Sequence, residues 1–269
     1  MMRKSTTTAE DNKYTAPALE KGLDIIDVLS SQEHGLTQVE IARSLQRSVS
    51  EIYRMLVVLR RRGIVDLEEG GERYFLTTRL FEMVNRTPII ARLTTAAGPV
   101  MTRLAKSIDE SVHLAILSED AVLVIGQIDN PGNNIMSVRL GTRVEAWRTS
   151  SGRVLLANQP EEWLAEFLKT YPHPDGVPGA QLRRELAATC KRRYEQMPSY
   201  IVKGVTNISA PIIGYAGSAI AALTIPYVER YFGSVPIETC RARLLEAAAQ
   251  ISQAIGGPLR PANGAQNLP

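Results

Sequence analysis

Residues 48–62 read SVSEIYRMLVVLRRR, and this stretch decides the fold of the first part of the chain. Its apolar residues are Val49, Ile52, Met55, Leu56 and Leu59. They recur at steps of three and four while arginines fill the remaining arc, which predicts an amphipathic helix with a basic outer face. Ser48 stands three residues before Glu51, the spacing of a capping box that satisfies backbone N–H groups at a helix start. The helix is therefore expected to begin near Val49.

The flanking segments predict the rest of a winged helix-turn-helix. Upstream, Thr37 and Glu40 repeat the capping-box spacing ahead of a second short apolar run. A tight polar segment at 46–47 joins the two expected helices, as in a helix-turn-helix. Downstream, IVDLEEGGERYFLT (64–77) places two β-prone runs around a Glu-Glu-Gly-Gly turn, which predicts the hairpin called the wing.

Charge in this region is concentrated on one side. The whole chain of 269 residues carries a net charge of only +3. Residues 41–62, however, contain six arginines (at 43, 47, 54, 60, 61 and 62) against the single acidic residue Glu51. A local basic face is the electrostatic footprint of a module that meets nucleic-acid phosphates on one side. Double-stranded DNA is therefore the expected partner.

The leading turn of helix 49–62 carries the residues expected to read bases. Arg54 can pair with guanine and Glu51 can accept a hydrogen bond from cytosine, with Ser50 beside them. The alternative for Glu51 is that the cap uses its carboxylate. Arginines at 61, 62 and 73 are expected at phosphates or in the wing, with plain solvation as their alternative. The full predicted DNA-binding set is Thr37, Gln38, Ser48, Ser50, Glu51, Tyr53, Arg54, Arg61, Arg62 and Arg73.

Length and composition predict two domains in one chain. At 269 residues, 44% hydrophobic and 22% charged, the chain is that of a globular protein with more than one core. The first helix is expected at 18–29, with Leu19, Leu23, Ile26 and Leu29 on its buried face. The expected division is a disordered tail at 1–14, the winged helix at 15–78, a linker helix at 79–96, a second domain at 97–257 and a disordered tail at 258–269.

The second domain has the pattern of an α+β fold. Strand-like runs occur at 111–117, 121–128, 135–140, 205–212 and 218–227. Helical runs lie between them, including a long charged one at 182–197 and a final one at 237–255, and a helix after Pro88 is expected to break or kink at Gly98-Pro99. Hairpin connections without strict β-α-β alternation favour a mostly antiparallel sheet in a mixed α/β domain.

Other classes of protein leave no clear mark. The first residues lack an apolar signal region and the most apolar window is too short for a bilayer, so we expect a cytoplasmic protein with no membrane contact. The histidines are scattered and no nucleophile elbow, phosphate loop or dinucleotide fingerprint occurs, which predicts no enzyme, no metal and no cofactor. His113, in an apolar run, is interpreted as an interior residue with its hydrogen bonds satisfied.

Residues 16–257 resemble the isocitrate lyase regulator (IclR) family of bacterial transcription factors. The resemblance is carried by ALEKGLDIIDVL (18–29), LTQVEIARSL (36–45), SEIYRML (50–56), TSSGRVLLA (149–157) and GVTNISAPI (204–212), in this order. The chain departs from the family pattern at Glu51, where Thr is usual, and at Asn207, where Cys is frequent. The resemblance implies a DNA-binding domain followed by an effector-binding domain.

The resemblance also implies where a small effector binds. Its pocket would be lined by Met136, Ser150, Ser151, Gly152, Asn207 and Thr224. Independently, a Ser-Ser-Gly turn at a helix start offers backbone N–H groups and the positive end of the helix dipole to a carboxylate. Serine and threonine also cap helices without binding a ligand, and that alternative stays open for each position.

These observations predict a ligand-responsive transcriptional regulator. A single winged helix reads only one half-site, so a homodimer or a dimer of dimers on a palindromic operator is expected, with a small organic or aromatic acid as effector. Two alternatives stay open: a winged-helix protein of architectural or protein-docking type without an effector, and a hydrolase-like domain fused to a winged helix.

Overall fold

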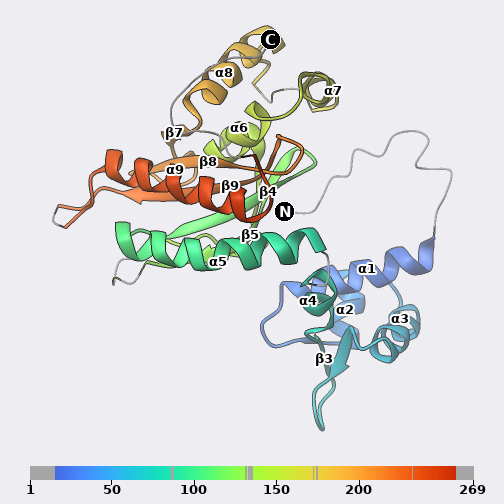
Figure 1. Cartoon of the computed structure of the whole chain (residues 1–269). Coiled ribbons are helices and arrows are strands. Elements are labelled where there is room, and N and C mark those ends of the chain that lie inside the picture. Colours follow the sequence, from blue (N-terminus) through green and yellow to red (C-terminus); the bar gives the residue numbers. More distant parts are fainter. Residues whose placement is uncertain are drawn as a thin grey trace. The chain divides into compact units, whose positions relative to one another are not determined.

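The computed structural model of the chain describes residues 16–85, 88–130, 132, 136–171, 173, 175–231 and 233–258. The chain divides into two compact units, residues 1–87 and 88–269 (Figure 1). The tails expected to be disordered, 1–14 and 258–269, lie outside the described residues except for Pro258. No described helix has both the length and the apolar character needed to span a bilayer.

The first unit is a winged helix-turn-helix, as predicted. Helices α1 (Pro17–Ser30), α2 (Gln38–Ser44) and α3 (Val49–Arg61) are followed by the hairpin of β2 (Val65–Leu67) and β3 (Arg73–Leu76). A short strand β1 (Leu36–Thr37) adds to β3, so the sheet order is β1-β3-β2. Helix α3 begins at Val49, the position that the capping box predicts.

Two helix faces differ from the prediction. On α1 the buried residues are Gly22, Ile25 and Leu29, while Leu19 and Leu23 are exposed. On α3 the core side consists of Ile52, Leu56 and Leu59, with Val49 exposed. Both helices carry apolar residues around more of their circumference than one core can cover. Periodicity alone therefore does not tell which of these apolar residues are buried. Helix α4 (Arg79–Asn85) then ends the unit.

The second unit is built on one antiparallel sheet with the order β6-β5-β4-β9-β8-β7. The inner strands are β4 (Val112–Ser118), β5 (Ala121–Ile128), β8 (Val205–Ile213) and β9 (Ala219–Val228). The short outer strands are β6 (Arg143–Glu145) and β7 (Glu195–Pro198). All neighbouring strands pair antiparallel, which confirms the predicted α+β class.

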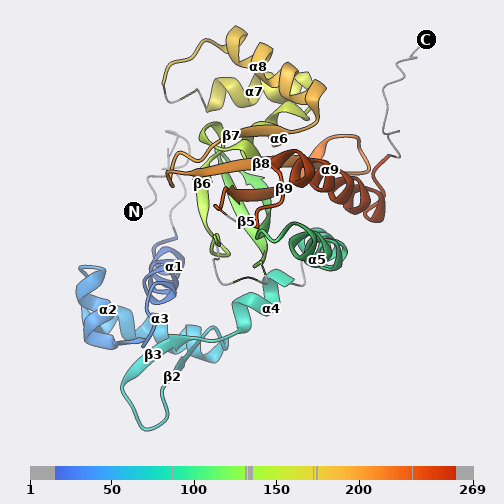
Figure 2. The ribbon, with the colours of Figure 1, turned by 90° about the vertical axis from the view of Figure 1, so that its left-hand side faces the viewer.

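Helices cover both faces of this sheet (Figures 1 and 2). On one face α5 (Pro88–Ile108) and α9 (Ile237–Ala254) pack with alternate residues of β4, β8 and β9. On the other face α6 (Ser150–Ala157), α7 (Glu161–Thr170) and α8 (Gly179–Arg192) form a second core, with Trp147 at its edge. Apolar residues on both faces of the inner strands explain their near-continuous apolar sequence.

Helix α5 corrects the expected linker and the expected break. It runs unbroken from Pro88 to Ile108 through Gly98 and Pro99. Pro99 lies on the exposed side, where water can replace the hydrogen bond that proline removes, while Leu93 and Ala97 are buried in the core. Residues 88–96, assigned to a linker from sequence, therefore belong to the second unit.

Two further segments differ from the expected elements. The long helix predicted at 182–197 ends at Arg192, because Arg193 takes a left-handed conformation (φ 65°) and residues 195–198 form β7 instead. The run predicted as a strand at 135–140 has no regular structure over its described residues, 136–140.

A buried ion pair joins the end of α5 to the chain after β9. The Arg230 guanidinium donates to the side chain of Asp109 and, at 2.8 Å, to that of Glu110. Glu110 is only 3% exposed. Burial raises the pKa of its carboxyl group, although Arg230 acts in the opposite direction. The fold therefore holds a carboxylate whose charge depends on one cation.

We predict that Arg230→Met destabilises the protein by about 3–5 kcal/mol near neutral pH, because it leaves the carboxylate of Glu110 buried without its cation. Burial already raises the pKa of Glu110, and removing Arg230, which lowers it, raises that pKa further. As the pH falls, Glu110 of the folded variant is protonated first, so the variant's loss of stability relative to the unchanged protein shrinks. Thermal melts at about pH 7.5 and about pH 5.5 measure this difference. The double variant Arg230→Met/Glu110→Gln is the control and should show no such recovery. An equal loss of stability at both pH values would contradict the prediction.

Candidate DNA-binding surface and effector pocket

The start of α3 is fixed by a complete capping box. The Ser48 hydroxyl accepts from the Glu51 N–H at 3.3 Å, and the Glu51 carboxylate accepts from the Ser48 N–H at 3.2 Å. The second carboxylate oxygen accepts from the Lys21 ammonium at 2.7 Å. The bond from Lys21, followed by those from Ser48, lowers the pKa of Glu51 to about 2. Both oxygens are therefore engaged, and the geometry favours the cap over base reading for Ser48 and Glu51.

The predicted residues on α2 are also engaged within the protein. Thr37 forms the second capping box with Glu40. The Gln38 side-chain amide donates to the carbonyl of Val49 at 2.9 Å, which ties the start of α2 to the start of α3. In this structure Thr37 therefore caps α2, and Gln38 links the starts of the two helices of the motif.

The outward face of α3 keeps its side chains available. Ser50, Tyr53, Arg54 and Arg61 are all exposed, as is Arg62 just after the helix. None of these arginines forms an ion pair with a described residue. Exposed Val49 and Val57 lie along the same face, so it combines apolar side chains with cations. Tyr53, Arg54, Arg61 and Arg62 therefore have no partner among the described residues and can meet a ligand, whereas the Ser50 hydroxyl is hydrogen-bonded to that of Ser48 at 3.3 Å.

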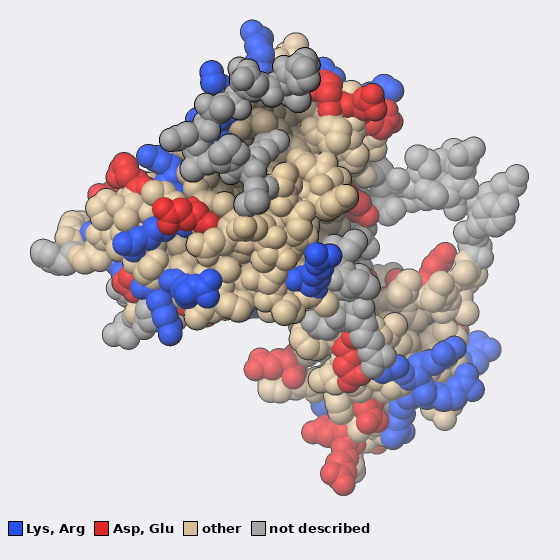
Figure 3. All heavy atoms as spheres, in the orientation of Figure 1, with Lys and Arg blue, Asp and Glu red and all other residues tan. Residues whose placement is uncertain are grey.

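The wing differs from the expected phosphate contact. Arg73 donates to the carbonyl of Gly35 at 3.1 Å and to the Glu40 carboxylate at 3.3 Å, so it joins the hairpin to α2. The turn at 68–72, EEGGE, carries three carboxylates and no cation. Figure 3 shows basic side chains gathered around α3 and acidic ones around the hairpin tip. An acidic tip repels phosphates, whereas the basic side chains around α3 attract them.

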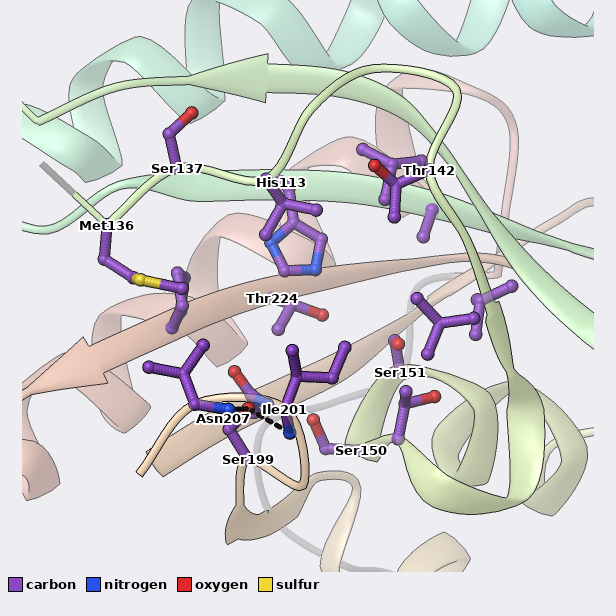
Figure 4. Close-up of a pocket in the computed structure, with 18 of the residues that line it drawn as sticks. His113, Met136, Ser137, Thr142, Ser150, Ser151, Ser199, Ile201, Asn207 and Thr224 are labelled. Atoms are coloured by element: carbon purple, nitrogen blue, oxygen red, sulfur yellow. Dashed lines mark hydrogen bonds between the residues drawn. The ribbon is translucent and has the colours of Figure 1, made fainter. Parts of the chain in front are cut away.

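A cavity of about 310 Å³ lies in the second unit, against the sheet face that α6 covers (Figure 4). Its walls come from β4, β5, β8 and β9, from the start of α6, and from the irregular segments around 136–142 and 199–202. Five of the six residues predicted for the effector line it: Met136, Ser150, Ser151, Asn207 and Thr224. Strands distant in sequence are thus brought together with the serines of the α6 turn.

Gly152, the sixth predicted residue, has another role. It does not line the cavity. A side-chain Cβ at this position would lie 2.1 Å from the carbonyl oxygen of Ala146, so only glycine lets α6 approach the preceding turn. Its N–H donates to the Thr149 hydroxyl at 3.0 Å, which caps the helix. Gly152 is therefore a packing residue, and one of the amides expected to hold a carboxylate is already paired.

The amides of Ser150 and Ser151 remain for a ligand. They occupy the first two positions of α6, where a helix leaves N–H groups without an internal acceptor. No acceptor for either is found among the described residues. Arg153, the cation that the sequence places in this loop, instead donates to the carbonyl of Trp147 at 3.3 Å and to Glu185 at 3.4 Å. Arg139, which sequence reasoning missed, is the one cationic side chain among the described residues that line the cavity.

A row of buried hydroxyl groups joins the start of α6 to the sheet. The hydroxyl oxygens of Ser150 and Ser209 are 2.7 Å apart, as are those of Ser209 and Thr224. Ser209 is fully buried and was not among the predicted site residues. In the sequence, its position between Ile208 and Ala210 in a strand-like run is the feature that indicates burial. These hydrogen bonds hold the Ser150 side chain, and with it the start of α6, against β8 and β9.

His113 contradicts its interpretation as a satisfied interior residue. It lines the cavity from β4, is only 7% exposed, and its Nδ1 is buried without a hydrogen-bond partner among the described residues. Burial lowers the pKa of its imidazole to about 4, so the ring is neutral near pH 7. In the sequence, the sign of this role is a histidine inside the otherwise apolar run VHLAIL (112–117).

The comparisons with known proteins agree with this architecture. Residues 18–69 match the IclR helix-turn-helix domain, and residues 83–253 match the bacterial transcriptional regulator IclR C-terminal domain. The transcriptional regulator KdgR of Escherichia coli is 28% identical, over 88% of this chain and 91% of its own length. The regulator BhcR of Paracoccus denitrificans is 27% identical, over 87% and 86%.

Solved structures give the same result. The IclR of Thermotoga maritima has a TM-score of 0.70 at 28% identity, covering 88% of this chain and 98% of its own. An IclR homologue from Microbacterium hydrocarbonoxydans, solved in complex with 4-hydroxybenzoate, has a TM-score of 0.73 at 27% identity, with the same coverage. The chain therefore belongs to the IclR family of bacterial transcriptional regulators, with a helix-turn-helix DNA-binding domain followed by the family's effector-binding domain.

Proposed function

We propose that this regulator reads its operator with the outward face of α3 and responds to a small organic acid bound in the cavity of the second unit. The observation that carries the proposal is the start of α6, where two amides without an acceptor among the described residues meet a cavity of about 310 Å³. A cavity of this size is at the small end of ligand pockets and suits a compact molecule.

The contacts of α3 support base reading by Arg54. It is exposed, has no partner among the described residues and stands one turn after Ser50 on the leading part of the helix. An arginine in this position can donate two parallel hydrogen bonds to O6 and N7 of guanine in the major groove. Arg61 and Arg62, at the end of the helix, meet phosphates in this proposal and supply affinity independent of sequence.

The lining of the cavity supports an acid as effector. The carboxylate accepts from the N–H groups of Ser150 and Ser151 at the positive end of the α6 dipole, with the Asn207 amide within the same cavity. The apolar body of the ligand lies against Val122, Val124 and Met136. The neighbour solved with 4-hydroxybenzoate binds an acid of this kind. Neutral donors hold the charge, so affinity on the order of micromolar or weaker is expected, as suits a reversible sensor.

The working unit is proposed to be a homodimer or a dimer of dimers on a palindromic operator, acting in the cytoplasm. A single winged helix reads one half-site, and two-fold symmetry doubles the interface with DNA and fixes the spacing of the half-sites. Effector control follows if the acid has different affinities for the forms of the protein that bind and release DNA.

Arg54→Ala should weaken binding to the operator by about tenfold or more, because a bidentate pair with guanine contributes about 1–3 kcal/mol of discrimination. The measurement is a gel shift at fixed salt on an operator selected from random DNA. Arg184→Ala, an exposed arginine on α8, is the matched control and should bind as the unchanged protein does. Equal affinity of the two variants would remove Arg54 from the groove.

Arg61→Ala and Arg62→Ala should weaken binding to all sequences alike. Each should also flatten the plot of log affinity against log salt by about one unit, because one phosphate is no longer neutralised. Arg73→Ala is the informative contrast. Because Arg73 is bonded to Gly35 and Glu40, its replacement should lower the melting temperature of the DNA-binding domain and leave the salt slope unchanged. A reduced salt slope for Arg73→Ala would instead assign this arginine to a phosphate.

Ser151→Trp should abolish effector binding by filling the cavity, and Asn207→Ala should weaken it. Hits from a thermal-shift screen of small carboxylates and aromatic acids are measured by calorimetry on the full chain. Thr170→Trp, on the exposed end of α7, controls for the added indole and should keep full affinity. If an acid binds and both pocket variants retain its affinity, its site lies elsewhere. If no acid binds, a winged-helix protein without an effector becomes the better interpretation.

A further inference from the structure

His113 is the most unusual side chain of the effector cavity. It extends from β4 into the cavity, on a different wall from Ser150 and Ser151 of α6 (Figure 4). Neither ring nitrogen has a hydrogen-bond partner among the described residues, and Nδ1 is completely buried. Nε2, at the tip of the ring, is the nitrogen that a ligand would reach first. A polar ring 7% exposed and without partners is rare, because buried polar groups are normally satisfied.

The residues opposite His113 on the neighbouring strands form no hydrogen bond with its ring in this structure. On β9 the residue directly opposite is Thr224, whose hydroxyl bonds to Ser209 and not to His113. On β5 the residue opposite is Gln127, whose Oε1 is itself buried without a partner among the described residues. The other titratable side chains that line the cavity are Arg139, which is exposed, and Tyr200. A bound molecule is therefore left as the partner for Nε2.

The chemistry of a neutral imidazole restricts that molecule. One ring nitrogen donates and the other accepts, and which one holds the proton depends on its surroundings. A hydroxyl group both donates and accepts, so it satisfies Nε2 in either tautomer. An ammonium group can only donate, and a second carboxylate would add a negative charge to a cavity whose one lining cation, among the described residues, is exposed Arg139.

We infer that the effector is a hydroxylated acid, whose hydroxyl pairs with His113 while its carboxylate lies at the start of α6. The inference rests on the proposed effector site and adds the second polar group that the site selects. An acid without the hydroxyl would leave His113 buried and unpaired, and sites built to hydrogen-bond a hydroxyl reject such analogues strongly. His113 is then the residue that determines specificity among acids of similar size.

The test uses two matched pairs of acids, benzoate with 4-hydroxybenzoate and phenylacetate with 4-hydroxyphenylacetate. Calorimetry on the full chain gives the ratio of affinities within each pair. We expect the unchanged protein to bind the hydroxylated member of at least one pair about tenfold more tightly or better. His113→Phe keeps the ring shape without its nitrogens and should bring that ratio close to one, with the plain acid bound at least as well as before.

Two amide variants locate the contact on the ring. The side-chain amide of His113→Gln lies near the former position of Nε2, whereas that of His113→Asn lies near Nδ1. The Gln variant should retain part of the preference for the hydroxylated acid and the Asn variant should lose it. A purely structural role of His113 would instead affect both members of each pair equally. The ¹⁵N shifts of the imidazole during titration give the same information if the Phe variant does not fold.

The outcomes separate this inference from the proposed function. If plain and hydroxylated acids bind equally and Ser151→Trp blocks both, the effector site stands and the role of His113 is wrong. Equal weakening of both members of a pair by His113→Phe also overturns it, since the ring would then serve the carboxylate or the fold. If none of these acids nor any acid of the screen binds, the hydroxylated-acid inference falls together with the proposed effector class.

Discussion

A sheet covered by helices on both faces must satisfy every polar side chain that its inner strands bury, and this constraint organises the second unit. Ser209 and Thr224 meet it by bonding to each other and to Ser150, and through that chain the start of α6 is held against β8 and β9. Because Ser150 of the helix start is one member of this row of hydroxyl groups, the hydrogen bonds that satisfy the sheet also orient the serines of the cavity. Packing and ligand site therefore share one network.

Close backbone approach completes this arrangement. Gly152 allows α6 to lie directly on the turn at Ala146, and Thr149 caps the helix, so the first two amides point where no acceptor of the described residues reaches them. A free helix start beside a cavity is a natural anion site. Nδ1 of His113 and Oε1 of Gln127 both depart from the rule of satisfied polar groups in this unit. His113 lines the cavity, and an exception of this kind is expected at a functional position, where the missing partner is a ligand.

In the first unit the polar residues at the two helix starts divide into two groups. Thr37, Ser48 and Glu51 stabilise the helices through capping boxes, and an oxygen engaged in a cap is not available to a base. Side chains one turn further along α3, such as Arg54, lack that local competition. The capping groups thus fix the geometry with which the outward face is presented, and the free side chains of that face supply the contacts.

The sequence by itself determined the start of α3 at Val49, the winged helix and the antiparallel α+β class. These features depend on periodicity, capping and short hairpin connections between residues close in sequence. Five of the six residues predicted for the effector line the cavity. Ser150 and Ser151 follow from the Ser-Ser-Gly turn at a helix start as well as from resemblance, whereas no local pattern links Met136 to Thr224.

Tertiary structure decided which of several apolar or polar residues took each role. Leu19 and Leu23 of α1 are exposed because the core of the first unit covers only part of an apolar circumference. The hydroxyls of Ser150 and Ser209 meet across 59 positions of sequence. Strand register places Thr224 and Gln127 opposite His113, and neither forms a hydrogen bond with its ring. The partner of a buried polar group is set by register and helix docking between distant segments, and local sequence spacing carries no record of either.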